Sequence, residues 1–187
     1  ARATVGELAR TDARRRGRGT RMKSHARVVV IGGGVVGEST LYHLTKKGCS
    51  DVVLLERTEL TSGSTWHAAG LLPLFNMSYT VGQLHKYSVD LYKRLPAETG
   101  QDVSFHVTGN LRLATCRDRM DEYRKYTGTA NTIGVPFQLI SPAEVKELWP
   151  LVNLGGDADT PAVIGALYHP DDGHIAPADL TAALRKA

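Results

Sequence analysis

The chain has 187 residues, of which 42% are hydrophobic and 22% are charged, as in ordinary globular domains. No apolar run approaches the ~20 residues that cross a bilayer, so a membrane protein is not expected. The net charge of +4 comes from the first 21 residues, which hold seven arginines and two acids, and the remainder sums to about −1. A tail without interleaved aromatic residues, on a body that is not basic, does not predict nucleic-acid binding.

Residues 1–25 are expected to form a disordered basic tail. An arginine-rich start is typical of a mitochondrial presequence, whereas Met22, directly before the first predicted strand, is typical of a natural start. The compartment is therefore predicted as bacterial cytoplasm, with the mitochondrial matrix as the alternative. Cys49 and Cys116 lack CxxC spacing and are interpreted as reduced thiols inside a cell.

A β-α-β unit opens the predicted fold. Residues 27–31 form a β-branched run typical of a buried parallel strand, and a glycine-rich turn follows at once. A helix is predicted over 36–47, with Gly48 after its end, and a second strand over 51–56. This order within about 30 residues predicts a Rossmann-like α/β dinucleotide-binding domain.

The turn carries the phosphate-binding fingerprint. Gly32 permits the tight turn, Gly34 lets the backbone approach a pyrophosphate, and Gly37 allows the helix to pack closely on the strand. Glu56 falls 19 residues after Gly37, where a carboxylate accepts hydrogen bonds from ribose hydroxyls. Glu56 disfavours a 2′-phosphate, although Arg57 leaves an opening for one. The alternative is a purely structural glycine turn.

Further elements follow a loop at 57–75. An amphipathic helix is predicted over 81–95, with Leu84, Ser88, Leu91 and Leu95 on one face and Pro96 and Gly100 helping to end it. A hairpin around Gly109-Asn110 is predicted within 105–115. The remaining predictions are a helix at 118–133, a strand at 135–140, a capped helix from Ser141, a strand at 164–168 and a helix at 177–186.

Residues 62–70, Ser-Gly-Ser-Thr-Trp-His-Ala-Ala-Gly, allow two interpretations. In one, Ser62, Ser64 or Thr65 caps a helix and His67 is an ordinary, partly buried histidine. In the other, the loop follows a nucleotide beyond its ribose, and small residues let a flat ring lie close. An unprotonated imidazole is nucleophilic and can bond to a flavin methyl position, whereas nicotinamide offers no such position.

These motifs resemble the FAD-linked dimethylglycine/sarcosine dehydrogenase family. The resemblance rests on 32–37, on Val-Leu-Leu-Glu-Arg at 53–57 and above all on 60–71, and it extends from about residue 26 onward. It implies that His67 is the covalent 8α attachment site of FAD. It also implies that the residues lining the cofactor are Val35, Val36, Glu56, Arg57, Gly63, Ser64, Thr65, Trp66, Ala68, Ala69, Gly70 and Leu71.

The same resemblance implies an activity. Members oxidatively demethylate dimethylglycine or sarcosine by hydride transfer from an N-methyl group to the flavin, and the resulting iminium is hydrolysed or donates its carbon to tetrahydrofolate. Electrons pass to an electron-transfer flavoprotein or to O₂. Catalytic residues and the tetrahydrofolate-binding part are expected beyond residue 187. The chain is thus expected to be an N-terminal fragment, inactive by itself.

The predicted domain division follows from this resemblance. Residues 26–99 are the first segment of the FAD-binding domain, 100–170 are part of an inserted α+β substrate domain, and 171–187 return to the FAD-binding domain. Two rival functions stay open. They are an NAD-dependent dehydrogenase, which has no use for Trp66-His67, and a non-catalytic regulatory relative of the same fold.

Several other residues invite a functional interpretation without supporting it. His169, Asp171, Asp172 and His174 are metal-ligand types, but Asp and Gly are common in turns and no further ligands follow at a fixed spacing, so no metal is predicted. Ala176 stands where family members often carry Asp. Trp149 is predicted to lie in the core at a helix end, and His85 and His106 to be structural or surface residues.

Overall fold

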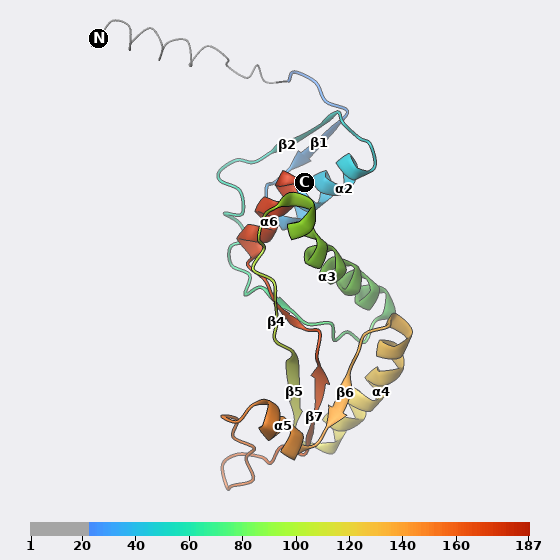
Figure 1. Cartoon of the computed structure of the whole chain (residues 1–187), viewed down its shortest axis with the longest axis vertical. Coiled ribbons are helices and arrows are strands. Elements are labelled where there is room, and N and C mark those ends of the chain that lie inside the picture. Colours follow the sequence, from blue (N-terminus) through green and yellow to red (C-terminus); the bar gives the residue numbers. More distant parts are fainter. Residues whose placement is uncertain (1–22) are drawn as a thin grey trace, which may run out of the picture.

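The computed structural model describes residues 23–187 and is elongated (Figure 1). Residues 1–22 of the basic tail predicted over 1–25 lie outside this range, and residues 23–25 form no helix or strand. One end holds the parallel strands and two short helices, the other end an antiparallel sheet, and a long helix runs between them (Figure 1).

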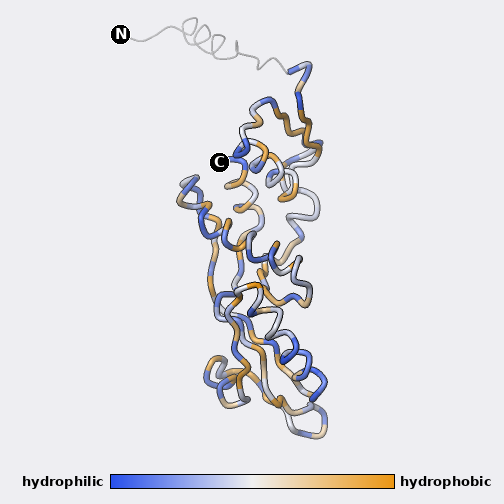
Figure 2. Tube along the Cα trace, turned by 90° about the vertical axis from the view of Figure 1, so that its right-hand side faces the viewer, coloured by the Kyte–Doolittle hydropathy of each residue, from blue (hydrophilic) through white to orange (hydrophobic). Residues whose placement is uncertain are grey.

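The predicted β-α-β unit is confirmed. β1 (Val28–Ile31) and β2 (Val52–Leu55) pair in parallel, with Val28 opposite Val52 and Ile31 opposite Leu55. α2 (Val35–Lys46) connects them, and Gly48 follows it with a φ of +84°. Both strands consist of Val, Ile and Leu, so they are hydrophobic throughout and stand out in the hydropathy trace (Figure 2). Their β-branched residues also favour extended backbone.

Three helices enclose the first core. α3 (Tyr79–Thr99) and α6 (Pro177–Lys186) pack with α2, and Leu95 is completely buried. A fully buried leucine contributes about 1.5–3 kcal/mol. The other members of this core are Tyr42, Leu91, Val103, Ile175, Leu180, Ala183 and Leu184.

Two predictions for α3 were wrong in part. Pro96 lies inside the helix, which ends at Gly100 in a left-handed conformation (φ +65°). Burial of Leu91 and Leu95, which share one face of the helix just before Pro96, outweighs the hydrogen bond that the proline removes. Leu84 was predicted on the buried face, yet it is 62% exposed, because the buried stripe runs through Gly82 and Val89 instead.

Six short strands form two antiparallel sheets. In the first, β8 (Gly173–His174) lies between β3 (Leu71–Leu72) and β4 (His106–Val107). In the second, β7 lies in the centre, and the strands are β5 (Asn110–Ala114), β7 (Gly165–His169) and β6 (Gln138–Ile140).

The predicted hairpin around Gly109-Asn110 was wrong. β4 pairs with β8 and β5 pairs with β7, so the two strands that flank the turn belong to different sheets. The turn is held from outside, since the N–H groups of Thr108 and Gly109 donate to the Asp172 carbonyl at 3.1 and 2.9 Å. β3 also interrupts the segment that was predicted as a loop.

Helices cover the second sheet. α4 (Arg117–Ile133) buries Tyr126 and Ala130 against Ala114 and Leu167. α5 (Pro142–Leu148) begins with the predicted capping box, in which Ser141 and Glu144 bond reciprocally. Trp149 at its end is 49% exposed, so its predicted core position was wrong. Strand β6 starts three residues later than predicted, although Val135 is buried.

Both cysteines are free thiols, as predicted. None of the helices within residues 23–187 is long and apolar enough to cross a membrane. The sheet of β3, β8 and β4 takes one strand from each of the three predicted segments 26–99, 100–170 and 171–187. The division into domains at those boundaries stays a prediction.

Candidate functional site

An open groove lies over the carboxyl end of β1 and the start of α2. It has a volume of about 900 Å³, part of which is open solvent. Many of the predicted site residues line it, and they come from the glycine turn, from the end of β2 and from the loop after β2. These residues are Gly32, Gly34, Val35, Val36, Gly37, Glu56, Gly63, Ser64 and Thr65. The groove therefore joins the two motifs that the sequence separates.

The glycines leave the backbone that lines this groove without side chains. Gly32 adopts a φ of +108°, and a Cβ there would meet no atom within 4 Å, so open space adjoins the turn. A Cβ on Gly37 would collide with the Gly32 carbonyl oxygen, so the helix can approach the strand only without a side chain. Gly34 is the N-cap of α2 and offers no side-chain cap. The helix start thus keeps N–H groups and partial positive charge available to a phosphate.

Thr65 connects the second motif to the first. Its hydroxyl accepts the Val35 N–H at 3.0 Å, and its side chain is buried. A Cβ on Gly34 would come within 2.9 Å of that hydroxyl oxygen. Gly34 is consequently required by Thr65 as well as by a pyrophosphate, a relation that the spacing of the fingerprint does not show.

Glu56 occupies the predicted place at the end of β2. Its carboxylate accepts the Gly33 N–H at 2.7 Å and the Thr58 N–H at 2.9 Å. These backbone hydrogen bonds, the Gly33 bond foremost, lower the pKa of Glu56 to about 2. Glu56 therefore stays a carboxylate at any physiological pH and borders the groove as a fixed acceptor.

His67 lies beyond the lined part of the groove, on an exposed turn. Its Nδ1 is 2.9 Å from the Gly63 carbonyl oxygen. A carbonyl can only accept, so Nδ1 carries the proton and Nε2 of the neutral ring keeps its lone pair. Since the side chain is exposed, that lone pair is accessible from outside. The segment forms turns and no helix, so the interpretation of this stretch as a capped helix start was wrong.

The other predicted residues take two kinds of position. Arg57, Trp66, Ala68, Ala69 and Leu71 are exposed, and Trp66 is 70% so. Gly70 instead contacts Ile175, the residue after β8, because its carbonyl accepts the Ile175 N–H at 2.9 Å and a Cβ would collide with the Ile175 carbonyl. None of these six lies among the residues that line the groove.

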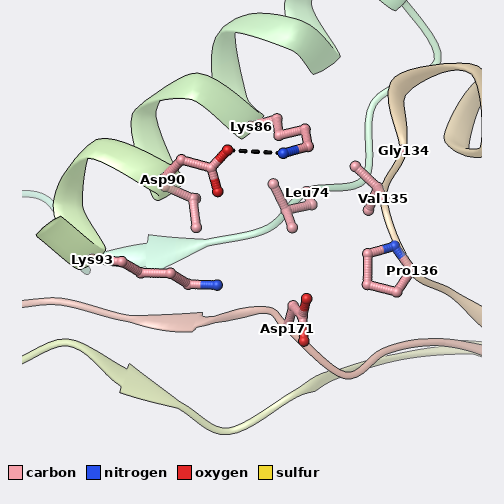
Figure 3. Close-up of a pocket in the computed structure, with 9 residues that line it drawn as sticks. Leu74, Lys86, Asp90, Lys93, Gly134, Val135, Pro136 and Asp171 are labelled. Carbon is pink, nitrogen blue, oxygen red and sulfur yellow. Dashed lines mark hydrogen bonds and ion pairs between the residues drawn. The ribbon is translucent and has the colours of Figure 1, made fainter.

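Two smaller cavities border α3. One, of about 430 Å³, lies between β3 and α3, and it places Leu71 near His85, whose buried Nδ1 has no partner within residues 23–187. The other, of about 290 Å³, is drawn in Figure 3. There Lys86, Asp90 and Lys93 come from α3, with Lys86 paired to Asp90, and Asp171 lies across from them on another segment (Figure 3). Neither cavity reaches the glycine turn.

His169 and Asp172, named above as metal-ligand types, form with Asn110 and Arg112 a buried polar cluster that was missed by the sequence analysis. Asn110, Arg112, His169 and Asp172 lie where β5 and β7 approach β8, and each has a buried polar atom without a partner among the described residues. Asp172 accepts the Leu74 N–H at 2.9 Å through its other oxygen. Burial raises the pKa of Asp172 to about 6 and lowers the pKa of His169 to about 4. Only the strand pairing brings these residues together, so no sequence signal could have identified the cluster.

The segment from His169 to His174 does not converge as a metal site would. His169 and Asp172 are buried, whereas Asp171 and His174 are exposed. Within residues 23–187 no group of three or more His, Cys, Asp or Glu side chains could hold a metal. His85 is half-buried and His106 is exposed.

The groove fits an extended dinucleotide. A bare helix start faces the space that a pyrophosphate would fill, and the Glu56 carboxylate borders the same space. His67, with its free nitrogen, continues the loop that Thr65 attaches to α2. An electrophilic ring system could be held there in addition to the phosphates.

Comparison with known proteins agrees with this geometry. The profile of the family described as DAO, FAD dependent oxidoreductase, matches residues 27–187. Mitochondrial dimethylglycine dehydrogenase of Rattus norvegicus is 46% identical over 162 residues, which are 87% of this chain and 18% of that protein. Mitochondrial sarcosine dehydrogenase of Homo sapiens is 42% identical over 167 residues, 89% of this chain and 18% of that protein.

A solved structure gives the same result for the fold. The crystal structure of L-proline dehydrogenase from P. horikoshii superimposes with a TM-score of 0.78 at 31% identity, over 88% of this chain and 41% of that chain. The chain spans less than a fifth of the length of the two curated relatives named above. It belongs to the FAD-dependent oxidoreductase (DAO) family and, within it, groups with the dimethylglycine and sarcosine dehydrogenases.

Proposed function

We propose that this chain holds the adenine-proximal part of an FAD and carries its covalent attachment point, His67, in an enzyme that oxidatively demethylates an N-methylated glycine. The observation that carries the proposal is the Nδ1–Gly63 hydrogen bond of 2.9 Å. It favours the tautomer in which Nε2 keeps its lone pair on an exposed side chain. Nε2 would bond to the flavin methyl carbon as that methyl group loses a proton, and the electron pair left on the flavin would pass to O₂.

Each part of the groove has a role in this proposal. The α2 N-terminus, with Gly32 and Gly34, binds the pyrophosphate, and Glu56 accepts hydrogen bonds from the ribose. Val35, Val36, Gly37, Gly63, Ser64 and Thr65 line the cofactor, and Arg57, Trp66, Ala68, Ala69, Gly70 and Leu71 lie beside its continuation. Bound FAD supplies the hydride acceptor, and a covalent histidyl bond tunes its potential.

The substrate, the acceptor and the compartment are part of the same proposal. Dimethylglycine is the first candidate substrate and sarcosine the second, since both relatives are named for them and are more than 40% identical. Their mitochondrial names favour the matrix over bacterial cytoplasm. The electron acceptor is an electron-transfer flavoprotein or O₂. Tetrahydrofolate is the candidate acceptor of the carbon, and it would bind outside the region that this chain spans.

Retention of flavin after denaturation tests the attachment. The full enzyme is produced with FAD, precipitated with acid and washed, and the fluorescence of the pellet is measured. We expect flavin in the pellet of the unaltered chain and of the His25→Ala control, and none for His67→Ala. Flavin lost from all three chains, or retained in all three, would overturn the attachment. Addition of dimethylglycine or sarcosine without oxygen to the full enzyme, followed through bleaching of the flavin absorbance, then tests the substrate.

A further inference from the structure

The sheet of β3, β8 and β4 brings two histidines together on an exposed face. His106 of β4 lies directly opposite His174 of β8 in the antiparallel register. Their ring centroids are 5.1 Å apart and the ring planes are tilted by 37°. Directly opposed residues of an antiparallel pair point to the same side of the sheet. The two imidazoles therefore stand side by side, although 67 residues separate them in the chain.

Neither imidazole is engaged in the fold. Both side chains are exposed, and neither forms a hydrogen bond or an ion pair with any residue in the range 23–187. The third residue in the row, Leu71, is also exposed and offers no polar partner. In contrast, the ring nitrogens of His43 bond to Ser39 and Tyr87. The paired nitrogens of His106 and His174 are thus available to a ligand from solvent.

We propose that His106 and His174 together bind a divalent transition-metal ion, with Cu²⁺ bound most tightly. Imidazole is the preferred side-chain ligand of Cu²⁺, Ni²⁺ and Zn²⁺, and the affinity of nitrogen sites rises to a maximum at Cu²⁺. Two protein ligands on an open face leave the other coordination positions to water, so the site is open and exchangeable. The proposed function places Leu71, in the same row, beside the FAD, so the metal titration uses the chain without added FAD.

Titration with Cu²⁺ alone tests the site. The full chain carries Cys116→Ser, because the exposed thiol would otherwise compete. Electron paramagnetic resonance at pH 7.5 should show one Cu²⁺ per chain with hyperfine coupling to two imidazole nitrogens. His106→Gln and His174→Gln should each remove one nitrogen and weaken binding at least about 10-fold, since even the loss of an outer-shell partner costs 10–100-fold. His25→Gln should change neither quantity.

Binding that survives in both variants, or a signal with a single nitrogen in the unaltered chain, overturns the proposal. A second measurement needs no substitution at the site. Zn²⁺ should protect His106 and His174, but not His25, from acylation by diethyl pyrocarbonate, as read from peptide masses. Equal acylation of the pair with and without Zn²⁺ also overturns it.

Discussion

Thr65 is the residue on which the two halves of the candidate site depend. It is buried in a loop whose neighbours are exposed, and its hydroxyl accepts the N–H of Val35, the first residue of α2. Through this bond the position of His67 relative to the phosphate loop is set by the first turn of α2. Loss of the hydroxyl should therefore affect both cofactor contacts and local stability.

A double-mutant cycle tests this relation. Gly34→Ala places a methyl group 2.9 Å from the Thr65 hydroxyl oxygen, so it should cost about 1–3 kcal/mol of unfolding free energy. Thr65→Ala removes the clashing atom, so the double variant should be more stable than the sum of the two single losses predicts. Urea unfolding measures all four chains. Strict additivity would show that Thr65 and Gly34 do not interact in this way.

Asp172 and His169 form the other residue-scale feature. Asp172 is almost completely buried with one oxygen unpaired, and His169 is completely buried with both nitrogens unpaired among the described residues. Burial disfavours the charged form of each group, which raises the pKa of Asp172 and lowers the pKa of His169. The two groups therefore shift stability with pH in opposite directions.

The sign for Asp172 is fixed by its raised pKa. The unfolded chain releases the proton near the ordinary value, whereas the folded chain holds it to about pH 6. Stability from this group is full below the unfolded pKa and falls as pH rises to 6, by roughly 3 kcal/mol in total. Asp172→Asn should thus be nearly neutral at pH 3.5 and stabilising at pH 7.5. Chemical denaturation at both pH values measures the difference, and a variant that is less stable at pH 7.5 would contradict the assignment.

His169 gives the reverse slope in an overlapping window. Its folded pKa is about 4, below the ordinary histidine value, so its contribution is present at neutral pH and is lost as pH falls toward 4. Between about pH 4 and 6 the two contributions oppose each other in the unaltered chain. Asp172→Asn removes one of them and exposes the other.

At the scale of elements, local patterns and strand pairings differ in how well the sequence predicts them. The β-α-β unit, α4, α5 and α6 follow from period, caps and glycines, because these signals act within a few residues. The prediction of a hairpin at Gly109-Asn110 was wrong because β4 and β5 pair with strands more than 50 residues away and not with each other. The prediction that Pro96 helps to end the helix was wrong because the burial of Leu95 outweighs the preference of proline against helix interiors.

Two helical glycines give a matched test at this scale. Gly128 in α4 is exposed, and a Cβ there would meet no atom within 4 Å. Gly128→Ala should therefore stabilise the chain by about 0.5–1 kcal/mol through helix propensity. Gly82 in α3 is buried against the Ile133 side chain, which an added methyl would overlap, so Gly82→Ala should lose that gain or reverse it. Thermal unfolding compares them, and equal gains at both positions would refute the packing of α3 on Ile133.

At the scale of the molecule, β1 and α2, which border the groove, lie at one end, and β5 and β7, which carry residues of the polar cluster, lie toward the other (Figure 1). The groove could be predicted because its glycines and Glu56 belong to one β-α-β unit with fixed spacing. The interpretation of His67 needed the resemblance, since spacing alone left it ambiguous. The Thr65 bond, the Asp172–His169 cluster and the His106–His174 pair depend on tertiary contacts, and no pattern in the sequence indicates them.

The central claim is that His67 carries the flavin, and peptide mass spectrometry tests it most directly. Tryptic digestion of the full enzyme, produced with FAD, yields the peptide 58–86, which contains His67 and, as an internal control, His85. We predict that fragment ions place the flavin mass on His67 and leave His85 unmodified. An unmodified peptide from a chain that retains flavin after denaturation, or the flavin mass on His85, would contradict the account.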